Sequence, residues 1–143
     1  MRKKTDNIIF YILIIGLIIL LFQPWTYFKT TESQKPDINL KYFDARHNKT
    51  TINVETWLEN TGDITAYNIT VFIRCRSQNG TLLFENILTP SIQYLRHNET
   101  TTIFYSFKID NKTKTVLHTI EIRWNGGMKA YLKEQKVRGE YHV

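Results

Sequence analysis

Most of the chain alternates apolar and polar residues with a period of two, and this pattern limits what it can fold into. Residues 51–59 show it clearly, because Ile52, Val54 and Leu58 alternate with Asn53 and Glu55 and their neighbours. No segment of this part keeps a helical period over ten or more residues. The residues predicted to face inward are Ile38, Leu40, Tyr42, Ile52, Val54, Thr56, Leu58, Ile69, Val71, Ile73, Cys75, Thr101, Ile103, Tyr105, Phe107, Ile109, Val116, His118, Ile120, Ile122 and Trp124.

Turn signals separate these segments at short intervals. The tetrapeptide Asn-Thr-Gly-Asp, the tripeptides Gln-Asn-Gly and Arg-His-Asn, and Asn-Gly-Gly stand between them, and such clusters favour turns. About seven strands over ~100 residues, each with one apolar face, are typical of two packed antiparallel sheets. We therefore expect an all-β fold, an immunoglobulin-like antiparallel β-sandwich over residues 37–137, preceded by one N-terminal transmembrane α-helix.

The C-terminal segment after residues 125–127 (Asn-Gly-Gly) fits two structures. Asn-Gly-Gly favours a hairpin turn, which would make Met128 to Val137 a last strand paired with residues 116–124. Four of its residues, Met128, Tyr131, Leu132 and Gln135, also fall at helical spacing. We expect the strand, followed by a frayed tail over residues 138–143.

The start of the chain is apolar on every face. Residues 8–22 read IIFYILIIGLIILLF and carry no charge, and the extension to residue 28 adds the aromatic residues typical of a membrane interface. The resulting 21 residues are long enough to cross a lipid bilayer. Residues 1–7 hold three basic side chains, which favour the cytoplasmic side. Residues 29–36 are polar, contain a proline and suit a tether.

A cleaved signal peptide is the competing interpretation, since it has the same basic start and a short apolar region. Cleavage favours small residues after the apolar region, whereas residues 22–27 read FQPWTY. We therefore expect a retained signal-anchor in the cytoplasmic membrane, single-pass, with the N-terminus inside and the C-terminal domain extracellular. The lipid bilayer would then be a partner through residues 8–28.

Five Asn-x-Thr motifs support the exported orientation. A composition of 11 asparagines and 22 serine or threonine residues among 143 predicts fewer than two by chance. All five lie after residue 47, on the expected outer side. This excess predicts attached N-glycans, although an Asn- and Thr-rich strand protein also collects such motifs. The predicted glycosylation sites are Asn48, Asn68, Asn79, Asn98 and Asn111.

Residues 58–71, LENTGDITAYNITV, resemble the hallmark "N-x-G … A-x-N-V-x-V" of CARDB and FxLYD-type immunoglobulin-like domains. The turn at residues 79–82 (NGTL) and the strand at residues 118–122 (HTIEI) are also similar to these families, over about residues 37–125. The Pro-Gly that these families usually carry before their next strand is replaced here by residues 96–98 (RHN). The resemblance implies a surface adhesion, spacer or assembly module without catalytic residues.

The sequence predicts no enzyme and no cofactor. The single cysteine, Cys75, excludes an internal disulfide framework and a multi-cysteine metal cluster, and on an inward position it is expected to act as a small apolar residue. His47 and His97 occur in similar hexapeptides, but these precede two antiparallel neighbours and so belong at opposite ends of a sheet. His118 is expected to be a hydrogen-bonded core residue. No metal site is therefore predicted.

Three large rings fall on outward positions: Trp57, Phe72 and Phe104. Exposed apolar groups mark contact surfaces, so we expect an interaction surface for a protein partner, unless another element covers the rings. No dense basic face accompanies the net charge of +6, so nucleic-acid binding is not expected.

The predicted function is that of a membrane-anchored, N-glycosylated, non-catalytic cell-surface module for adhesion, spacing or assembly of envelope components. An accessory single-pass subunit of a larger membrane complex or surface filament is one alternative. A domain that binds a small ligand, sugar or metal, through the loops at one end is a second.

Overall fold

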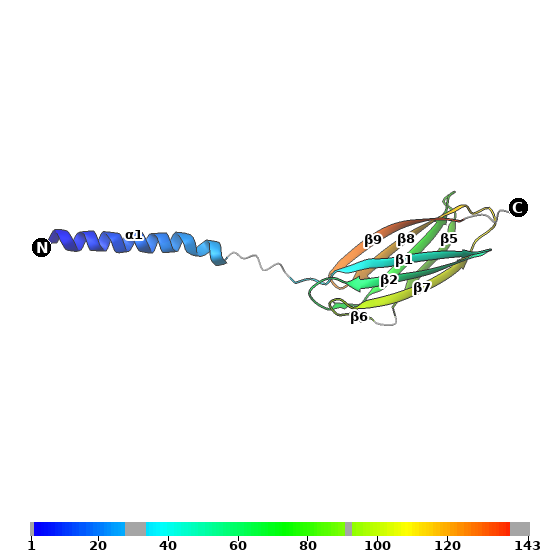
Figure 1. Ribbon diagram of the computed structural model, residues 1–143, viewed down its shortest axis with the longest axis horizontal. Helices are drawn as coiled ribbons and strands as arrows, with labels where there is room; N and C mark the ends of the chain where they lie inside the picture. Colours follow the sequence, from blue (N-terminus) through cyan, green and yellow to red (C-terminus); the bar gives the residue numbers. More distant parts are fainter. Residues whose placement is uncertain (1, 28–33, 91–92, 138–143) are drawn as a thin grey trace. The chain divides into compact units, whose positions relative to one another are not determined.

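The computed structural model describes residues 2–27, 34–90 and 93–137 (Figure 1). Two compact units, Met1–Ser33 and Gln34–Val143, divide the chain. In the first unit, helix α1 runs over Arg2–Tyr27.

Within the part of the chain that the structure describes, no helix is long and apolar enough to span a membrane. The membrane-spanning role of residues 8–28 stays a prediction. Most of the tether and the tail at residues 138–143 lie outside the described residues.

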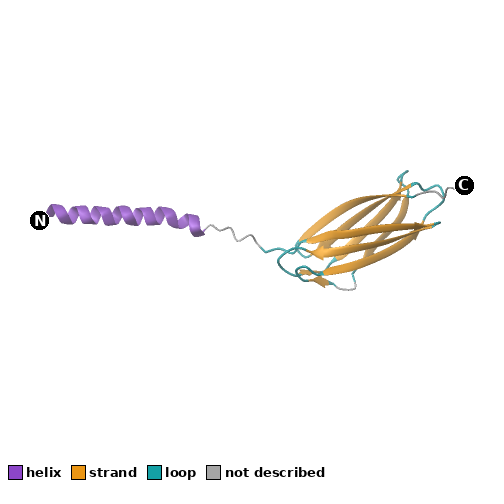
Figure 2. Ribbon diagram, viewed as in Figure 1, coloured by secondary structure: helices purple, strands orange, loops and turns teal. Residues whose placement is uncertain are grey.

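The second unit is an antiparallel β-sandwich, as predicted, and its described residues contain strands but no helix (Figure 2). Seven long strands form its two main sheets, which agrees with the predicted number, and two strands of two residues each form a small third sheet. The strands are β1 (Ile38–Asn48), β2 (Thr51–Asn60), β3 (Ala66–Tyr67), β4 (Thr70–Ser77), β5 (Leu82–Leu88), β6 (Tyr94–Leu95), β7 (Thr100–Lys108), β8 (Thr115–Trp124) and β9 (Gly127–Lys136).

The strands are arranged in two layers. The first sheet has the order β1-β2-β7 and the second sheet the order β5-β4-β8-β9, while β3 pairs with β6. Every pairing is antiparallel. Because β2 and β7 are antiparallel neighbours, the start of each strand lies at the end of the other.

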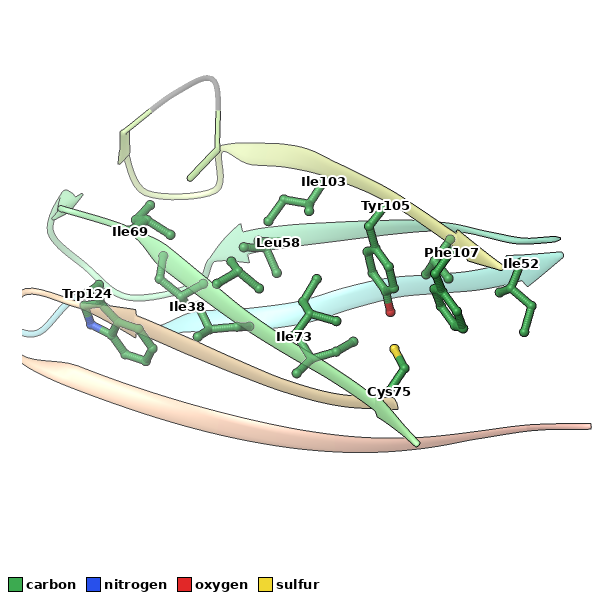
Figure 3. Packing of buried hydrophobic residues seen from close by; sticks show 14 of the residues in the cluster. Ile38, Ile52, Leu58, Ile69, Ile73, Cys75, Ile103, Tyr105, Phe107 and Trp124 are labelled. Carbon is green, nitrogen blue, oxygen red and sulfur yellow. The ribbon is translucent and has the colours of Figure 1, made fainter. Parts of the chain in front are cut away.

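The core lies between the two main sheets (Figure 3). Alternate residues of β2, β4, β7 and β8 are buried, which confirms the inward sets predicted for these strands. β-Branched residues dominate, as expected of side chains that pack well on a pleated surface. The buried apolar residues are Ile38, Ile52, Val54, Leu58, Ala66, Ile69, Val71, Ile73, Cys75, Leu95, Ile103, Tyr105, Phe107, Ile109, Val116, Ile120, Ile122 and Trp124.

One inward prediction is wrong. The pairing of β1 with β2 shifts between Leu40 and Tyr42, where a β-bulge places one extra residue in β1. After the bulge Tyr42 lies opposite Trp57 on the outer face, and its side chain is 39% exposed. Strict alternation cannot anticipate an inserted residue, because one extra position moves every later side chain to the other face.

The C-terminal segment is a strand, and its helical alternative is wrong. Strand β9 pairs with β8 along its whole length through a turn in which Gly126 has φ +95°, a conformation that glycine adopts without strain. Side chains of β9 then reach β1 in the other sheet. The Gln135 Nε2 group donates to the Ala45 carbonyl at 3.1 Å, and the Tyr131 hydroxyl accepts from the Leu40 amide at 3.2 Å.

Asn60 holds together the end of the sandwich at which the chain enters. Its side chain is fully buried and makes four hydrogen bonds. The Oδ1 atom accepts from the amides of Asp37 (3.1 Å) and Gly62 (3.0 Å), and the Nδ2 group donates to the carbonyls of Ile64 and Leu95, both at 2.8 Å. These bonds fix the turn after β2 against the start of β1 and against β6, and they explain the Asn-x-Gly motif in structural terms.

Candidate functional site

A cluster of polar side chains from both sheets lies in the interior of the sandwich. His118 of β8 is fully buried, and its Nδ1 atom lies 3.0 Å from the Tyr105 hydroxyl and 3.3 Å from the Cys75 sulfur. Its Nε2 atom lies 3.0 Å from Gln135 Oε1. Gln135 can only accept at that oxygen, so Nε2 carries the proton and Nδ1 is the acceptor. Figure 3 shows the Tyr105 hydroxyl pointing toward the Cys75 sulfur.

The chemistry of this cluster is that of a packed core. Burial raises the pKa of the Cys75 thiol to about 12 and also raises the pKa of Tyr105, because a charged form loses its water. Burial lowers the pKa of His118 for the same reason. The thiolate is the reactive form of cysteine, so Cys75 is not poised as a nucleophile. The prediction of two inward core residues at Cys75 and His118 is confirmed.

The other predicted histidines do not form a site. His47 lies near the end of β1, beside the turn that leads into β2. His97 precedes β7, and its Nδ1 atom lies 2.7 Å from the Gly62 carbonyl oxygen. The antiparallel register of β2 and β7 puts these positions at opposite ends of the sheet, as predicted. Among the described residues, no group of three or more His, Cys, Asp or Glu side chains could hold a metal ion.

The outer face of the first sheet gathers exposed rings. Trp57 of β2 is 39% exposed and Phe104 of β7 is 67% exposed. The bulge in β1 adds Tyr42, whose ring centroid lies 4.8 Å from that of Trp57. The Trp57 indole also donates from Nε1 to Glu55 Oε1 at 2.7 Å. The tryptophan is therefore held on the surface by a ring contact on one side and by a hydrogen bond on the other.

Beside these rings the face is hollowed. The hollow has a volume of about 520 Å³, within the range of small-molecule sites. Asp44 and Phe104 both lie opposite Glu55 in the register, one on each side. Asp44 Oδ2 accepts from Arg46 Nε at 2.7 Å, and this ion pair raises the pKa of the guanidinium. We call this the first-sheet hollow, lined by Asp44, Arg46, Asn53, Val54, Glu55, Phe104, Tyr105 and Ser106.

The three predicted surface rings do not lie together. Phe72 belongs to β4, in the second sheet, where it lies opposite Ile87 of β5 and Glu121 of β8. Its ring is half-buried, and the guanidinium carbon of Arg74 lies 5.6 Å from its centroid. Trp57 and Phe104 thus share the outer face of the first sheet, and Phe72 lies on the opposite side of the sandwich.

All five asparagines of the Asn-x-Thr motifs are exposed, and all lie in or next to turns. Three belong to one end of the sandwich, where Gln78 Nε2 donates to the Lys112 carbonyl and the Ile109 amide donates to the Thr50 carbonyl. Two belong to the end at which the chain enters. Asn68 lies in a bend with φ +54°, just before the strand it was expected to begin. The first group is Asn48, Asn79 and Asn111, and the second is Asn68 and Asn98.

Comparison with known proteins bears on the fold. No protein-family model and no curated protein matches the chain. Among solved structures, the putative ApaA protein from Bordetella pertussis is 13% identical, with a TM-score of 0.52 over 76% of this chain and 98% of that chain. This likeness supports the β-sandwich.

Two further solved structures have TM-scores below 0.5. The GAE domain of GGA2p from Saccharomyces cerevisiae is 10% identical, with a TM-score of 0.48 over 75% of this chain and 95% of that chain. A putative beta-galactosidase from Bacteroides fragilis is 16% identical, with a TM-score of 0.47 over 68% of this chain and 16% of that chain. The resemblance to CARDB and FxLYD-type domains stays a prediction.

Sequence reasoning missed most of the first-sheet hollow. Asp44 and Arg46 follow the bulge, so their outward direction was hidden together with that of Tyr42. Glu55 was on a predicted outward position, but nothing in the sequence indicated that it would lie between Asp44 and Phe104. The available signal was the spacing of two residues between Glu55 and Trp57, which puts both on one face of a strand.

Proposed function

We propose that this protein is a membrane-anchored, N-glycosylated surface module that contacts other envelope components through the outer face of its first sheet, without catalysis. Residues 8–28 would hold it in the cytoplasmic membrane, with residues 1–7 inside and the sandwich outside. The observation that carries the proposal is the arrangement of the sandwich surface, on which glycosylation motifs and exposed rings occupy different parts.

The arrangement of the asparagines favours glycosylation. An N-glycan is bulky and needs a solvent-exposed acceptor, and each of the five asparagines is exposed. Because they lie at the two ends of the sandwich, glycans attached to them would leave the centres of both main sheets uncovered. A contact surface on a sheet face would then stay accessible on a glycosylated protein.

The outer face of the first sheet is the better contact surface of the two. It presents three aromatic rings, and aromatic residues are enriched at protein interfaces. Both outer faces carry exposed ion pairs, such as Arg46–Asp44 on the first sheet and Arg74–Glu85 on the second. The second sheet differs in its ring, since Phe72 is half-buried. The buried Cys75 and His118 cluster offers no reactive group, which favours a non-catalytic role.

The first experiment tests orientation and glycosylation together. The full-length chain with a C-terminal tag is produced in its native membrane, and each of the five asparagines is replaced by glutamine in turn. We expect each replacement to reduce the apparent mass by one glycan step, and protease added to intact cells to remove the tag. Asn86→Gln is the control, because Asn86 is exposed but begins no Asn-x-Thr motif. A tag protected in intact cells, with all variants equal in mass, would refute the proposal.

A further inference from the structure

The first-sheet hollow combines an exposed ring with hydrogen-bonding groups of both kinds. Phe104 presents the most exposed large ring of the sandwich among the described residues. Asp44 and Glu55 supply acceptors, Arg46 supplies donors, and the Asn53 amide supplies both. We propose that this hollow binds one neutral pyranose ring of a carbohydrate, with the ring packed on Phe104 and its hydroxyl groups hydrogen-bonded to the polar side chains.

The charges of the hollow select against most other ligands. An anionic ligand would meet the carboxylates of Asp44 and Glu55. A cationic ligand would meet the Arg46 guanidinium, although Asp44 already pairs with it at 2.7 Å. A sugar hydroxyl both donates and accepts, so a neutral sugar can use both the acceptors and the donors of the hollow.

The dimensions of the site also fit a single sugar ring. Adjacent strands lie about 4.8 Å apart, and side chains two positions apart on one strand lie about 7 Å apart. Two rows over three strands therefore make a patch of roughly 10 by 7 Å, which one six-membered ring can cover. The C–H groups on the face of a pyranose carry partial positive charge, and the face of an aromatic ring is negative.

Both carboxylates of the hollow have hydrogen-bond partners before a ligand arrives. Asp44 is bound to Arg46, and Glu55 is bound through Oε1 to the Trp57 indole at 2.7 Å. Each carboxylate keeps one oxygen outside these two bonds. Preorganised side chains lose less freedom on binding, which matters in a shallow site. The inference deepens the proposed function, on which it rests in part, by naming a ligand class for the same face.

The experiment uses the full-length chain in a polyoxyethylene detergent, which brings neither a sugar nor a cation. Saturation-transfer NMR is recorded with the methyl glycosides of glucose, galactose and mannose in both anomeric forms, and with sorbitol as a polyol without a ring. We expect saturation transfer to at least one glycoside and none to sorbitol. Phe104→Ala should weaken binding at least about fivefold, and Phe104→Trp should retain it.

Phe72→Ala is the matched control, because Phe72 is an outward phenylalanine on the other sheet, and it should leave the affinity unchanged. Since the ligand is neutral, raising sodium chloride from low to high concentration should also leave the affinity unchanged. Binding of a tetralysine peptide that falls with salt, without binding of any glycoside, would show a cation site instead and would overturn the inference. Absence of binding to every glycoside, or equal losses in Phe104→Ala and Phe72→Ala, would also overturn it.

This test is independent of the orientation experiment. Glycoside binding by the purified chain requires neither an attached glycan nor a membrane-spanning helix. A failure here would leave the anchored and glycosylated surface module standing, and a failure of the orientation experiment would leave the sugar site standing.

Discussion

Replacing Asn60 by alanine tests whether one buried side chain holds the entry end of the sandwich. The substitution removes four hydrogen bonds. The Gly62 amide and the Leu95 carbonyl have buried bonds to Asn60 and would be left without partners, at a cost of about 1–3 kcal/mol each. The Asp37 amide and the Ile64 carbonyl are closer to water and can recover part of their loss. We expect Asn60→Ala to lower the free energy of unfolding by about 3–5 kcal/mol.

Urea unfolding of the full-length chain, followed by tryptophan fluorescence, measures this change. Trp124 reports on the same end, because its Nε1 group donates to the Pro36 carbonyl at 3.3 Å. The control Asn86→Ala removes an exposed asparagine from a strand and should change the free energy of unfolding by less than about 0.5 kcal/mol. A loss in Asn60→Ala no larger than in this control would refute the reasoning.

Asn60→Asp separates the hydrogen bonds from the packing. Aspartate has nearly the same shape, but one of its oxygens would face the carbonyls of Ile64 and Leu95. Burial and these carbonyls should raise the pKa of the new carboxyl in the folded state above its unfolded value. The free energy of unfolding of Asn60→Asp, relative to the native chain, should therefore fall as the pH rises from the unfolded pKa to the folded one. A pH-independent difference between the two chains would contradict this assignment.

Further predictions concern the core and the turn after β2. Burial lowers the pKa of His118 in the folded state, so only the unfolded chain gains a proton at this side chain as the pH falls below about 6.5. The free energy of unfolding should therefore drop by up to about 1.4 kcal/mol per pH unit. The variant His118→Gln should lose this pH dependence in urea titrations. Cys75, with a pKa raised to about 12, should resist thiol reagents at pH 8 in the native chain and react once urea unfolds it. Gly62→Ala should destabilise by about 2 kcal/mol or more, since a Cβ atom there would lie near the Lys35 carbonyl oxygen and the Asp37 amide; a urea midpoint equal to that of the native chain would contradict the clash.

The secondary structure of the sandwich could be predicted from the sequence, because a strand with one buried face has apolar residues at every second position. Strands β2, β4, β7 and β8 repeat core-facing residues, most of them apolar, at every second position, and the structure buries these residues. The choice of a strand for residues 128–137 depended on turn chemistry, since the Asn-Gly pair that begins the turn favours a tight hairpin. The alternation and the turn residues are both local signals, and both can be recognised without knowing which strand pairs with which.

The candidate site could not be predicted, because it depends on pairing. Which residues share a face of a sheet depends on which strands are neighbours, and periodicity alone does not assign Phe72 and Phe104 to different sheets. The bulge after Leu40 adds a second difficulty, since it reverses the side-chain direction of the remainder of β1. The hydrogen bonds of Asn60 join three segments, namely the start of β1, the turn after β2 and β6, and two of these lie more than 20 residues from Asn60 in the sequence. The motif was therefore visible, but its structural role was not.

The positions of the glycosylation motifs and of the exposed rings on this surface follow from what the fold requires of each part of the sandwich. Turn residues at the two ends must be polar, because their backbone groups bind water, and this is where the Asn-x-Thr motifs lie. The faces that form the core must be mostly apolar, and Cys75 and His118 are buried there as packing residues. Among the described residues, the two outer sheet faces are therefore where a side chain is least constrained by folding. Both faces carry ion pairs, and the outer face of the first sheet adds three exposed rings. Since the fold does not require exposed rings at Tyr42, Trp57 and Phe104, their presence on one face supports the proposal that this face is a contact surface.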